Sequence, residues 1–433
     1  MSVNAGGMQG NADSDACSIS TDGRFVAFRS KATNLVPGMA NGFNAIYVRD
    51  RQTNTITRVS VNNSGKQGND DSDLPSISGD GRYVAFESYA KNLVPNDSNF
   101  RPDIFVHDRE THTTKRVSVS SSGKQSTDFS GGARISSDGR YVAFFSAANT
   151  LVPNDTNSSY DVFVRDLQTN TTSRVSLNST GGQGEQGSGG HIDISGDGRF
   201  VVFESAAENL VNNDSNSRTD IFVRDRQTSL TTRVSINSNG GQANNDCYEP
   251  RITSDGRFVV FRSLAGNLVT GDGNNRNDVF LRDRQTSTTK RISMSNNGGA
   301  INGDAVTPAI SNDGRFVIYE SNATNIVPDT NGVHDIFLRD RQLNKNALVS
   351  LANDGSQGDL SSFVPSISGT GRYVAWETGS GNLVPNDTLG YSDIFVRDRN
   401  ATAAASGSGA EEEALLSAEP EWMGGSALDG EVP

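Results

Sequence analysis

Five loops of this sequence carry aspartate and asparagine at one fixed spacing, Asp-x-Asn-x-x-x-Asp. The motif comprises Asp97, Asn99 and Asp103; Asp155, Asn157 and Asp161; Asp214, Asn216 and Asp220; Asp272, Asn274 and Asp278; and Asp329, Asn331 and Asp335. Hard oxygen donors at alternate positions of a turn are what calcium requires, with carbonyls and water completing about six to eight ligands. Alternatively, the Asp and Asn side chains cap the loop's own amides as Asx turns, and the final Asp orients the next strand. Both interpretations stay open, and calcium is the one candidate cofactor.

Two related loops depart from this motif. Leu389 replaces the asparagine between Asp387 and Asp393, and a further copy carries Met39, Asn41 and Ala45 at the three positions. A metal site, if present, is therefore not a feature of every copy.

A second pairing recurs without exception: an arginine that follows a glycine, and an aspartate 25 or 26 residues later. The pairs are Arg24 and Asp50, Arg82 and Asp108, Arg140 and Asp166, Arg199 and Asp225, Arg257 and Asp283, Arg315 and Asp340, and Arg372 and Asp398. A catalytic site is not expected in seven equal copies. The pattern instead predicts a bidentate salt bridge that holds a turn in each unit.

Catalysis would need residues that break the repeat. The four histidines, His107, His112, His191 and His334, have no nucleophile or metal partner that the sequence reveals. His191 is the best candidate, because it precedes a strand expected to line a central channel and the unusual Asp193 follows it closely. We treat His191 and Asp193 as candidates for the channel mouth, although surface or packing roles are favoured for all four histidines.

The elements that position these residues form a repeat. Its Gly-Arg pair recurs with glycine at 23, 81, 139, 198, 256, 314 and 371, at intervals of 57 to 59 residues. Within one unit, four short runs rich in Val, Ile, Phe, Tyr and Thr predict strands around residue 77 and over 82–88, 103–109 and 114–120. The Asp80-Gly81 pair predicts a tight hairpin between the first two.

Seven four-stranded units predict an all-β fold, a seven-bladed β-propeller over residues 1–400. Residues 2–15 match residues 60–73 at an offset of 58, so the chain begins on the fourth strand of a unit. The seventh unit passes Asp398 without a fourth strand of its own. We therefore expect the N-terminal strand to complete the last blade and close the ring.

Two intervals depart from 58 residues. The longer one has an extra residue between Ser176 and Ser195, which we assign to the loop that joins two units. The shorter one comes from Val327-Pro328-Asp329, where an earlier unit has Val94-Pro95-Asn96-Asp97. Both changes fall on the face that carries the long loops, and binding sites usually lie on such loops.

Composition limits the class of partner. The chain has 433 residues, a net charge of −13 and two cysteines, Cys17 and Cys247, that fall in distant units. The charge argues against nucleic acid and anionic membranes as partners. A disulfide is not expected, and no apolar run is long enough to span a membrane.

The remaining expectations concern compartment and assembly. Loops rich in Asn, Asp and Thr favour a periplasmic or extracellular location, while the N-terminus lacks a signal-peptide pattern. We expect a monomer. Residues 401–433 change to Ala, Ser, Gly and Glu, which predicts a flexible acidic tail.

The tract from Pro75 to Phe86, followed by Asp103-Ile104-Phe105-Val106-His107-Asp108, resembles the WD40-like repeat of TolB-type β-propellers. The resemblance covers all seven units and implies the propeller fold. Relatives include periplasmic translocation components, gating propellers of serine oligopeptidases and some lyases. We expect a non-enzymatic protein that binds a protein, peptide or glycan on its long-loop face; the alternative is a polysaccharide lyase or glycosidase with its site at the channel mouth.

Overall fold

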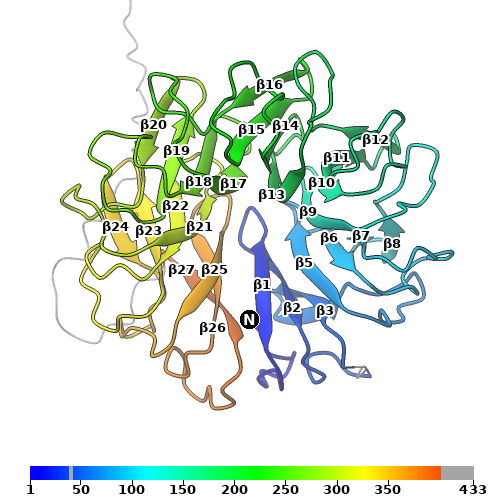
Figure 1. The fold of residues 1–433 in the computed structure, drawn as a ribbon. Coiled ribbons are helices and arrows are strands. Elements are labelled where there is room, and N and C mark those ends of the chain that lie inside the picture. The colour runs from blue at the N-terminus through cyan, green and yellow to red at the C-terminus, as the bar shows by residue number, and fades with distance from the viewer. Residues whose placement is uncertain (39–41, 401–433) are drawn as a thin grey trace, which may run out of the picture.

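The computed structural model describes residues 1–38 and 42–400, which form 27 β-strands and no helix. The strands make seven antiparallel sheets arranged as blades around a central axis (Figure 1). Strands of one blade follow one another in chain order. The predicted seven-bladed β-propeller is therefore confirmed. The predicted tail, residues 401–433, and two residues of the incomplete motif, Met39 and Asn41, lie outside the described part.

The first three blades contain β1 (Ser14–Ile19), β2 (Phe25–Ser30), β3 (Ala45–Asp50) and β4 (Thr55–Arg58); β5 (Ser72–Ile77), β6 (Tyr83–Ser88), β7 (Asp103–Asp108) and β8 (Thr113–Arg116); and β9 (Ser130–Ile135), β10 (Tyr141–Ser146), β11 (Asp161–Asp166) and β12 (Thr171–Arg174). The next three contain β13 (Ser188–Ile194), β14 (Phe200–Ser205), β15 (Asp220–Asp225) and β16 (Leu230–Arg233); β17 (Cys247–Ile252), β18 (Phe258–Ser263), β19 (Asp278–Asp283) and β20 (Thr288–Arg291); and β21 (Ala305–Ile310), β22 (Phe316–Ser321), β23 (Asp335–Asp340) and β24 (Lys345–Leu348). The seventh contains β25 (Ser362–Ile367), β26 (Tyr373–Thr378) and β27 (Asp393–Asp398).

Side chains of the repeat hold the first hairpin of each blade. In the second blade, Asp80 Oδ1 accepts a hydrogen bond from the Arg82 amide at 2.9 Å, and Ser78 Oγ accepts one from the Tyr83 amide at 2.9 Å. Gly81 has a φ of 75°, and a Cβ added there would lie 2.1 Å from the Phe25 ring of the preceding blade. Glycine is thus required by the turn and by the contact between blades.

The predicted arginine–aspartate clamp is present in all seven blades. Arg199 shows its geometry: Nε donates to one oxygen of Asp225 at 2.9 Å and Nη2 to the other at 2.7 Å. The hydrogen bond from Arg199 holds the pKa of Asp225 far below its ordinary range. The seven clamps join Arg24 to Asp50, Arg82 to Asp108, Arg140 to Asp166, Arg199 to Asp225, Arg257 to Asp283, Arg315 to Asp340 and Arg372 to Asp398.

A second arginine, directly after the third strand of six blades, joins neighbouring blades. Arg284 donates to the carbonyl of Gly256 and lies over the Phe200 ring of the preceding blade at 4.5 Å from its centroid. Only the third blade replaces this arginine, by Leu167. The contact therefore couples six of the seven blade junctions through a cation–π interaction.

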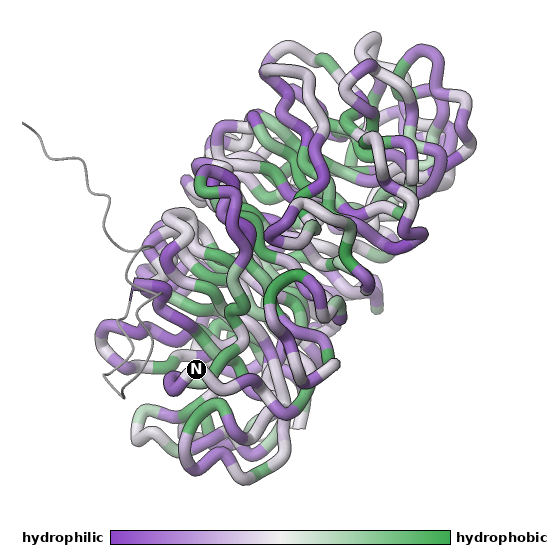
Figure 2. The backbone as a smooth tube through the Cα atoms, turned by 90° about the vertical axis from the view of Figure 1, so that its left-hand side faces the viewer, coloured by the Kyte–Doolittle hydropathy of each residue, from purple (hydrophilic) through white to green (hydrophobic). Residues whose placement is uncertain are grey.

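The core lies between successive blades. Val84, Ala85 and Phe86 of β6 are fully buried. Phe86 and Phe105 share one cluster with Ala27 and Ile46 of the first blade. Seen from the edge of the ring, hydrophobic residues follow the strands and the loops at the rims are mostly hydrophilic (Figure 2).

The N-terminus closes the ring. The amino group of Met1 donates to the carbonyl of Ile394, the Ile394 amide donates to Ser2 Oγ at 3.0 Å, and the Ser2 hydroxyl donates to Asp393. Two of these contacts recur at the 58-residue offset in the first blade, where the Val59 amide donates to the Ile46 carbonyl at 2.9 Å and the Ile46 amide donates to Ser60 Oγ at 3.0 Å. Ala45 stands there in place of Asp393, so the first blade lacks the third contact. The predicted closure is confirmed, but the described part of the last blade has three regular strands, and Met1 and Ser2 join β27 without forming a fourth.

One prediction of loop length is wrong. The extra residue of the 59-residue interval lies inside β13, which has seven residues where the other inner strands have six. Ser188 pairs with Ser205 as Ser130 pairs with Ser146, and the register shifts between Ser188 and Ile192. Gly189 and Gly190, with φ of 138° and 85°, absorb the added residue as a wider bulge. The loop before β13 is unchanged, whereas the shorter interval does fall between β22 and β23.

Candidate functional site

The inner strands β1, β5, β9, β13, β17, β21 and β25 surround a cavity of about 240 Å³ on the propeller axis. One register position, five residues before each hairpin glycine, supplies a ring of side chains to this cavity. The ring consists of Ser18, Ser76, Arg134, Asp193, Arg251, Ala309 and Ser366. The repeat therefore places one variable side chain from every blade around the same opening.

Three members of this ring, Ser18, Ser76 and Asp193, also join neighbouring blades. Ser18 Oγ accepts a hydrogen bond from the Ile77 amide at 3.2 Å, and Ser76 Oγ accepts one from the Ile135 amide at 3.1 Å. Asp193 takes the same role in the fourth blade, because its Oδ2 accepts the Ile252 amide at 3.0 Å. Asp193 therefore also has a structural role, because it joins the fourth blade to the fifth.

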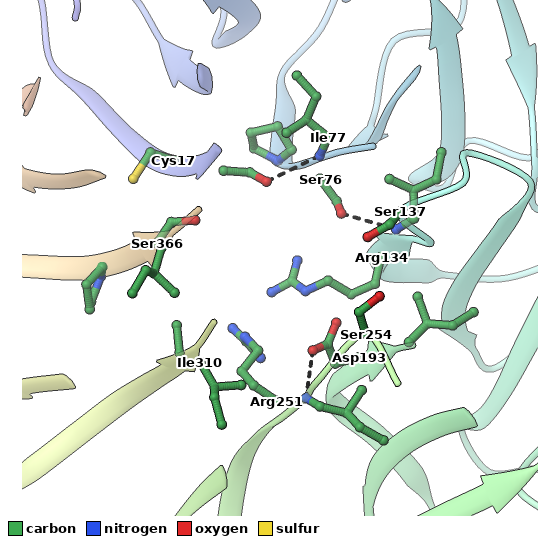
Figure 3. A pocket seen from close by; sticks show the side chains of 18 of the residues that line it. Cys17, Ser76, Ile77, Arg134, Ser137, Asp193, Arg251, Ser254, Ile310 and Ser366 are labelled. Atoms are coloured by element: carbon green, nitrogen blue, oxygen red, sulfur yellow. Dashed lines mark hydrogen bonds between the residues drawn. The ribbon is translucent and has the colours of Figure 1, made fainter. Parts of the chain in front are cut away.

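Arginine cannot accept such a bond, and Arg134 and Arg251 extend into the channel instead (Figure 3). Arg134 Nη1 donates to the Ala133 carbonyl at 3.2 Å, and Arg251 Nη1 donates to the Pro250 carbonyl at 2.9 Å. Neither forms a salt bridge within the part of the chain that the structure describes. Burial, and then the charge of Arg251, lowers the pKa of Arg134 to about 10, and the Asp193 carboxylate opposes this only in part.

At the end of the channel formed by the short turns, most hairpins are hydrogen-bonded to the hairpin of a neighbouring blade. The Thr21 amide donates to the Gly79 carbonyl at 3.0 Å, the Gly79 amide to Ser137 at 2.9 Å, and the Gly196 amide to Ser254 at 2.9 Å. These bonds hold that end of the channel rigid. The opposite end of the channel faces the long loops, and side chains there differ between blades.

At the long-loop end, glutamates of the second strands reach under the bulges of the inner strands. Glu377 accepts the Ala16 amide at 2.9 Å, and Glu204 accepts the Glu249 amide at 2.6 Å. Burial raises the pKa of Glu87 to about 7. These carboxylates were not predicted from the sequence, where their signal is a glutamate directly after the buried aromatic residue of the second strand.

The two candidates for the channel mouth have different surroundings. Asp193 lines the cavity between Arg134 and Arg251. His191 does not line it; its Nδ1 lies 2.9 Å from Glu204 Oε1, and its side chain is 46% exposed. His334 makes the same contact with Glu320, at 2.8 Å. His191 and Asp193 therefore do not share one site. His191 pairs with the buried Glu204, and His334 pairs with the buried Glu320.

The remaining histidines have local roles. His107 is buried, and its Nδ1 lies 2.9 Å from Thr114 Oγ1. Burial lowers the pKa of His107 to about 4. His112 has a φ of 55° in a tight turn. Neither lines the channel.

In four of the five acid-rich loops, an arginine at the end of the fourth strand lies between the two aspartates. Arg116 Nη1 is 3.2 Å from Asp97 and 3.3 Å from Asp103, and Asn99 donates to Asp103 at 3.1 Å. The other three sets join Arg174 to Asp155 and Asp161, Arg233 to Asp214 and Asp220, and Arg291 to Asp272 and Asp278, with Asn157, Asn216 and Asn274 donating to the final aspartate. These arginines were not predicted as partners of the acidic loops from the sequence.

The asparagine of the motif also forms the predicted Asx turn, because Asn99 Oδ1 accepts the Arg101 amide at 3.1 Å. The fifth loop, in the sixth blade, differs. Leu348 stands at the position of the arginine, although Asn331 still donates to the Gly358 carbonyl at 2.9 Å as Asn99 does to the Ser126 carbonyl at 3.0 Å. Within residues 1–38 and 42–400, no three or more His, Cys, Asp or Glu side chains are grouped as metal ligands.

No family model matches this sequence, and no curated protein matches it. Solved structures match its fold. An oligogalacturonate lyase in complex with manganese has a TM-score of 0.56 at 12% identity, over 90% of this chain and 91% of that one. The β-propeller domain of the Trilobed protease from Pyrococcus furiosus has a TM-score of 0.54 at 10% identity, over 91% and 99%. For TolB from Acinetobacter baumannii the TM-score is 0.42 at 14% identity, over 77% of this chain and 62% of TolB.

These comparisons define the class of the protein as a seven-bladed β-propeller. The seven antiparallel blades around one axis (Figure 1) confirm the fold that the resemblance of the repeat to TolB-type propellers implies. The neighbours include both lyases and peptidases. At such low identity, the likeness is one of fold alone.

Proposed function

We propose that this propeller is a non-enzymatic binding protein and that it holds an acidic oligosaccharide in the central channel, entered from the long-loop face. The observation that carries the proposal is that two guanidinium groups, those of Arg134 and Arg251, lie in a cavity of about 240 Å³ (Figure 3) and form no salt bridge within the described residues. Two like charges in one confined space favour an anion between them. A carboxylate matches the planar donor set of arginine.

The charge of the channel contrasts with that of the whole chain, which is −13. An acidic surface favours neutral or cationic ligands in general, yet the lining of the channel offers two cations against the single carboxylate of Asp193. Binding of an anion would therefore be local and specific. It would not depend on long-range attraction.

Apolar side chains complete the site. Leu74 and Val364 line the cavity near its long-loop end and are 45% and 41% exposed. The neighbouring Phe363 is 38% exposed. A few charged groups within an apolar rim are typical of small-ligand sites, and the carbon-bound faces of sugar rings suit such a rim.

The structural neighbours support the choice of an acidic sugar. Two of them are oligogalacturonate lyases, with TM-scores of 0.56 and 0.52, and by name they act on a chain of acidic sugars. The likeness itself concerns the fold. The two arginines of the channel are the reason to propose an acidic sugar as the ligand of this chain as well.

A lyase is the second candidate function. His191 and Glu204 form a histidine–carboxylate pair on the long-loop side, and a half-exposed imidazole of this kind can accept a proton. An enzyme of this class would release an unsaturated sugar product that absorbs ultraviolet light. Formation of that product from oligogalacturonate, and its loss in His191→Gln, would favour this second function.

The test is calorimetric titration of the chain with oligogalacturonate, with the neutral oligogalactose as a matched ligand. We expect binding of the acidic sugar alone, and a loss of at least tenfold in affinity in Arg134→Gln and in Arg251→Gln. Arg218→Gln, at an exposed arginine 3.9 Å from Asp246, is the control and should bind like the parent. Equal binding of the neutral sugar, or preference for an acidic peptide such as oligoglutamate, would reject the proposal.

A further inference from the structure

We propose that the sixth blade binds a hard divalent cation of the calcium type between Asp329 and Asp335, at the place that an arginine guanidinium takes in the second to fifth blades. The inference rests on the contacts of this acid pair and on comparison among the blades of this chain. It is independent of what the central channel binds.

The second blade shows how an acid pair is neutralised elsewhere. Asp97 and Asp103 are both buried, and both lie within 3.3 Å of Arg116 Nη1. Gln125 Nε2 donates to the same two carboxylates at 2.9 and 3.1 Å. One cation and one amide thus satisfy two buried anions.

The sixth blade lacks this cation. Its outer strand β24 ends at Leu348, which aligns with Arg116, Arg174, Arg233 and Arg291. An apolar side chain cannot offset the charge of Asp329 or Asp335. Aspartate nevertheless occupies both positions of the motif in this blade, as it does in the second to fifth blades.

A second change accompanies the first. Arg116 Nη2 donates to the Asn96 carbonyl at 3.3 Å, and Arg174 Nη2 donates to the Asn154 carbonyl at 3.3 Å. The residue deleted from the loop of the sixth blade, where Val327-Pro328-Asp329 replaces Val94-Pro95-Asn96-Asp97, is the counterpart of this asparagine. The sixth blade thus lacks both the arginine and the carbonyl that accepts its hydrogen bond. The joint loss indicates that the whole site is rearranged and that more than one contact has changed.

The pair is left with unsatisfied oxygens. Asp335 is fully buried and Asp329 is 9% exposed, and Oδ2 of each lacks a hydrogen bond of normal geometry in the part of the chain that the structure describes. The other oxygens are engaged: Ser350 donates to Asp335 Oδ1, and Gln357 Nε2 donates to Asp329 Oδ1 at 3.3 Å. Burial, and with it the charge of Asp329, raises the pKa of Asp335, although the Ser350 hydroxyl and the Asn331 amide oppose this in part. Two neighbouring buried carboxylates without a cation are strongly unfavourable.

The chemistry of the donors selects the cation. Two carboxylates carry two negative charges, so a divalent ion neutralises them and a monovalent ion does not. Asn331, Thr330 and Gln357 bring amide and hydroxyl oxygens to the same loops, and the Thr330 hydroxyl already contacts Gln357 Oε1 at 2.9 Å. Oxygen-only sets completed by water are those that calcium accepts.

The acid pair of the seventh blade has a different solution. Gln9 Nε2 donates to Asp387 at 2.6 Å and to Asp393 at 2.7 Å, and Ser2 donates to the other oxygen of Asp393. No oxygen of that pair is both buried and unpartnered. The sixth blade is therefore the place where an external cation is needed.

The experiment is a calorimetric titration of the full chain with calcium chloride after treatment with a chelator, at constant ionic strength. We expect one calcium per chain and a melting temperature that rises with calcium, because the ion binds the folded state. Leu348→Arg restores the residue of the other four blades and should abolish both effects. Absence of calcium binding in the parent overturns the proposal, as does unchanged binding in Leu348→Arg.

A second pair of variants keeps the test decisive if Leu348→Arg folds poorly. Asp335→Asn keeps the shape of the buried side chain and removes its charge, so it should abolish calcium binding. Asp155→Asn makes the same change beside Arg174 in the third blade, and it should leave the calcium stoichiometry unchanged. Loss of binding in Asp155→Asn but not in Asp335→Asn would place the cation elsewhere and overturn the assignment.

Discussion

Arg134 of β9 and Arg251 of β17 direct their guanidinium groups into one channel from two blades that are separated only by the blade of Asp193. Each occupies the position at which Ser18 and Ser76 hold the next blade through a hydrogen bond. The third and fifth blades thus lack the side-chain hydrogen bond to the next blade and carry a cation near the axis instead. This is the arrangement expected of a binding site, where local stability is exchanged for function.

Replacing Arg251 with glutamine should increase stability. The pKa of Arg134 is lowered by burial and then by the charge of Arg251, so removal of that charge relieves repulsion. We expect the free energy of unfolding at neutral pH to rise by about 1 kcal/mol, measured by urea unfolding. Arg101→Gln, at an exposed arginine 3.5 Å from Asp128, should change it little. A clear loss of stability in Arg251→Gln would mean that the arginine is structural.

Glu87 should make stability fall as pH rises. Burial raises its pKa to about 7 in the folded state, above the ordinary value of 4.5. Between these two values the unfolded chain has lost the proton that the folded chain keeps, so stability declines from about pH 4 to pH 7 and then levels. Glu87→Gln should remove this decline and be more stable at pH 8 by about 2 kcal/mol. Thermal unfolding of both proteins across this pH range measures the difference; parallel profiles would contradict the prediction.

Ser2→Ala should weaken the closure of the ring. The substitution leaves the Ile394 amide and the buried Asp393 carboxylate without the Ser2 hydroxyl. An unsatisfied buried group costs about 1–3 kcal/mol, and deletion of residues 1–7 should cost more. Ser64→Ala, at an exposed serine that contacts only its own turn, is the control for differential scanning calorimetry. Equal melting of the parent and the deletion variant would mean that the last blade closes without the N-terminus.

Leu167→Arg should stabilise the third blade. In six blades the equivalent arginine stacks on an aromatic ring of the preceding blade, as Arg109 does over Phe25 at 4.4 Å from the ring centroid. An arginine at 167 would have Tyr83 beneath it, because Leu167 already packs against the cluster that contains Tyr83. The expected gain is about 0.5–1 kcal/mol in urea unfolding. Arg109→Leu, the reverse change at the first junction, should cost a similar amount.

Much of the fold could be predicted because it is determined locally. The spacing of Gly81 and Arg82, the alternation of the strands and the offset that aligns Ser2 with Ser60 are all visible in the chain, and the structure confirms the blades, the clamps and the closure. The error at β13 shows the limit of this reasoning. Counting residues detects an insertion, but only the pairing of Ser188 with Ser205 shows whether a loop or a bulge absorbs it.

The sequence by itself determined the type of blade, its sevenfold repetition and the set of acidic loops, since each follows from residues that lie near one another in the chain. Tertiary structure decided which charges meet. Arg116 reaches Asp97 and Asp103 only after the outer strand has folded back along the blade, and Arg134 meets Arg251 only because the ring brings every inner strand to one axis. The physical reason is that electrostatic energy depends on distance and burial, and in a closed ring neither follows from separation along the chain.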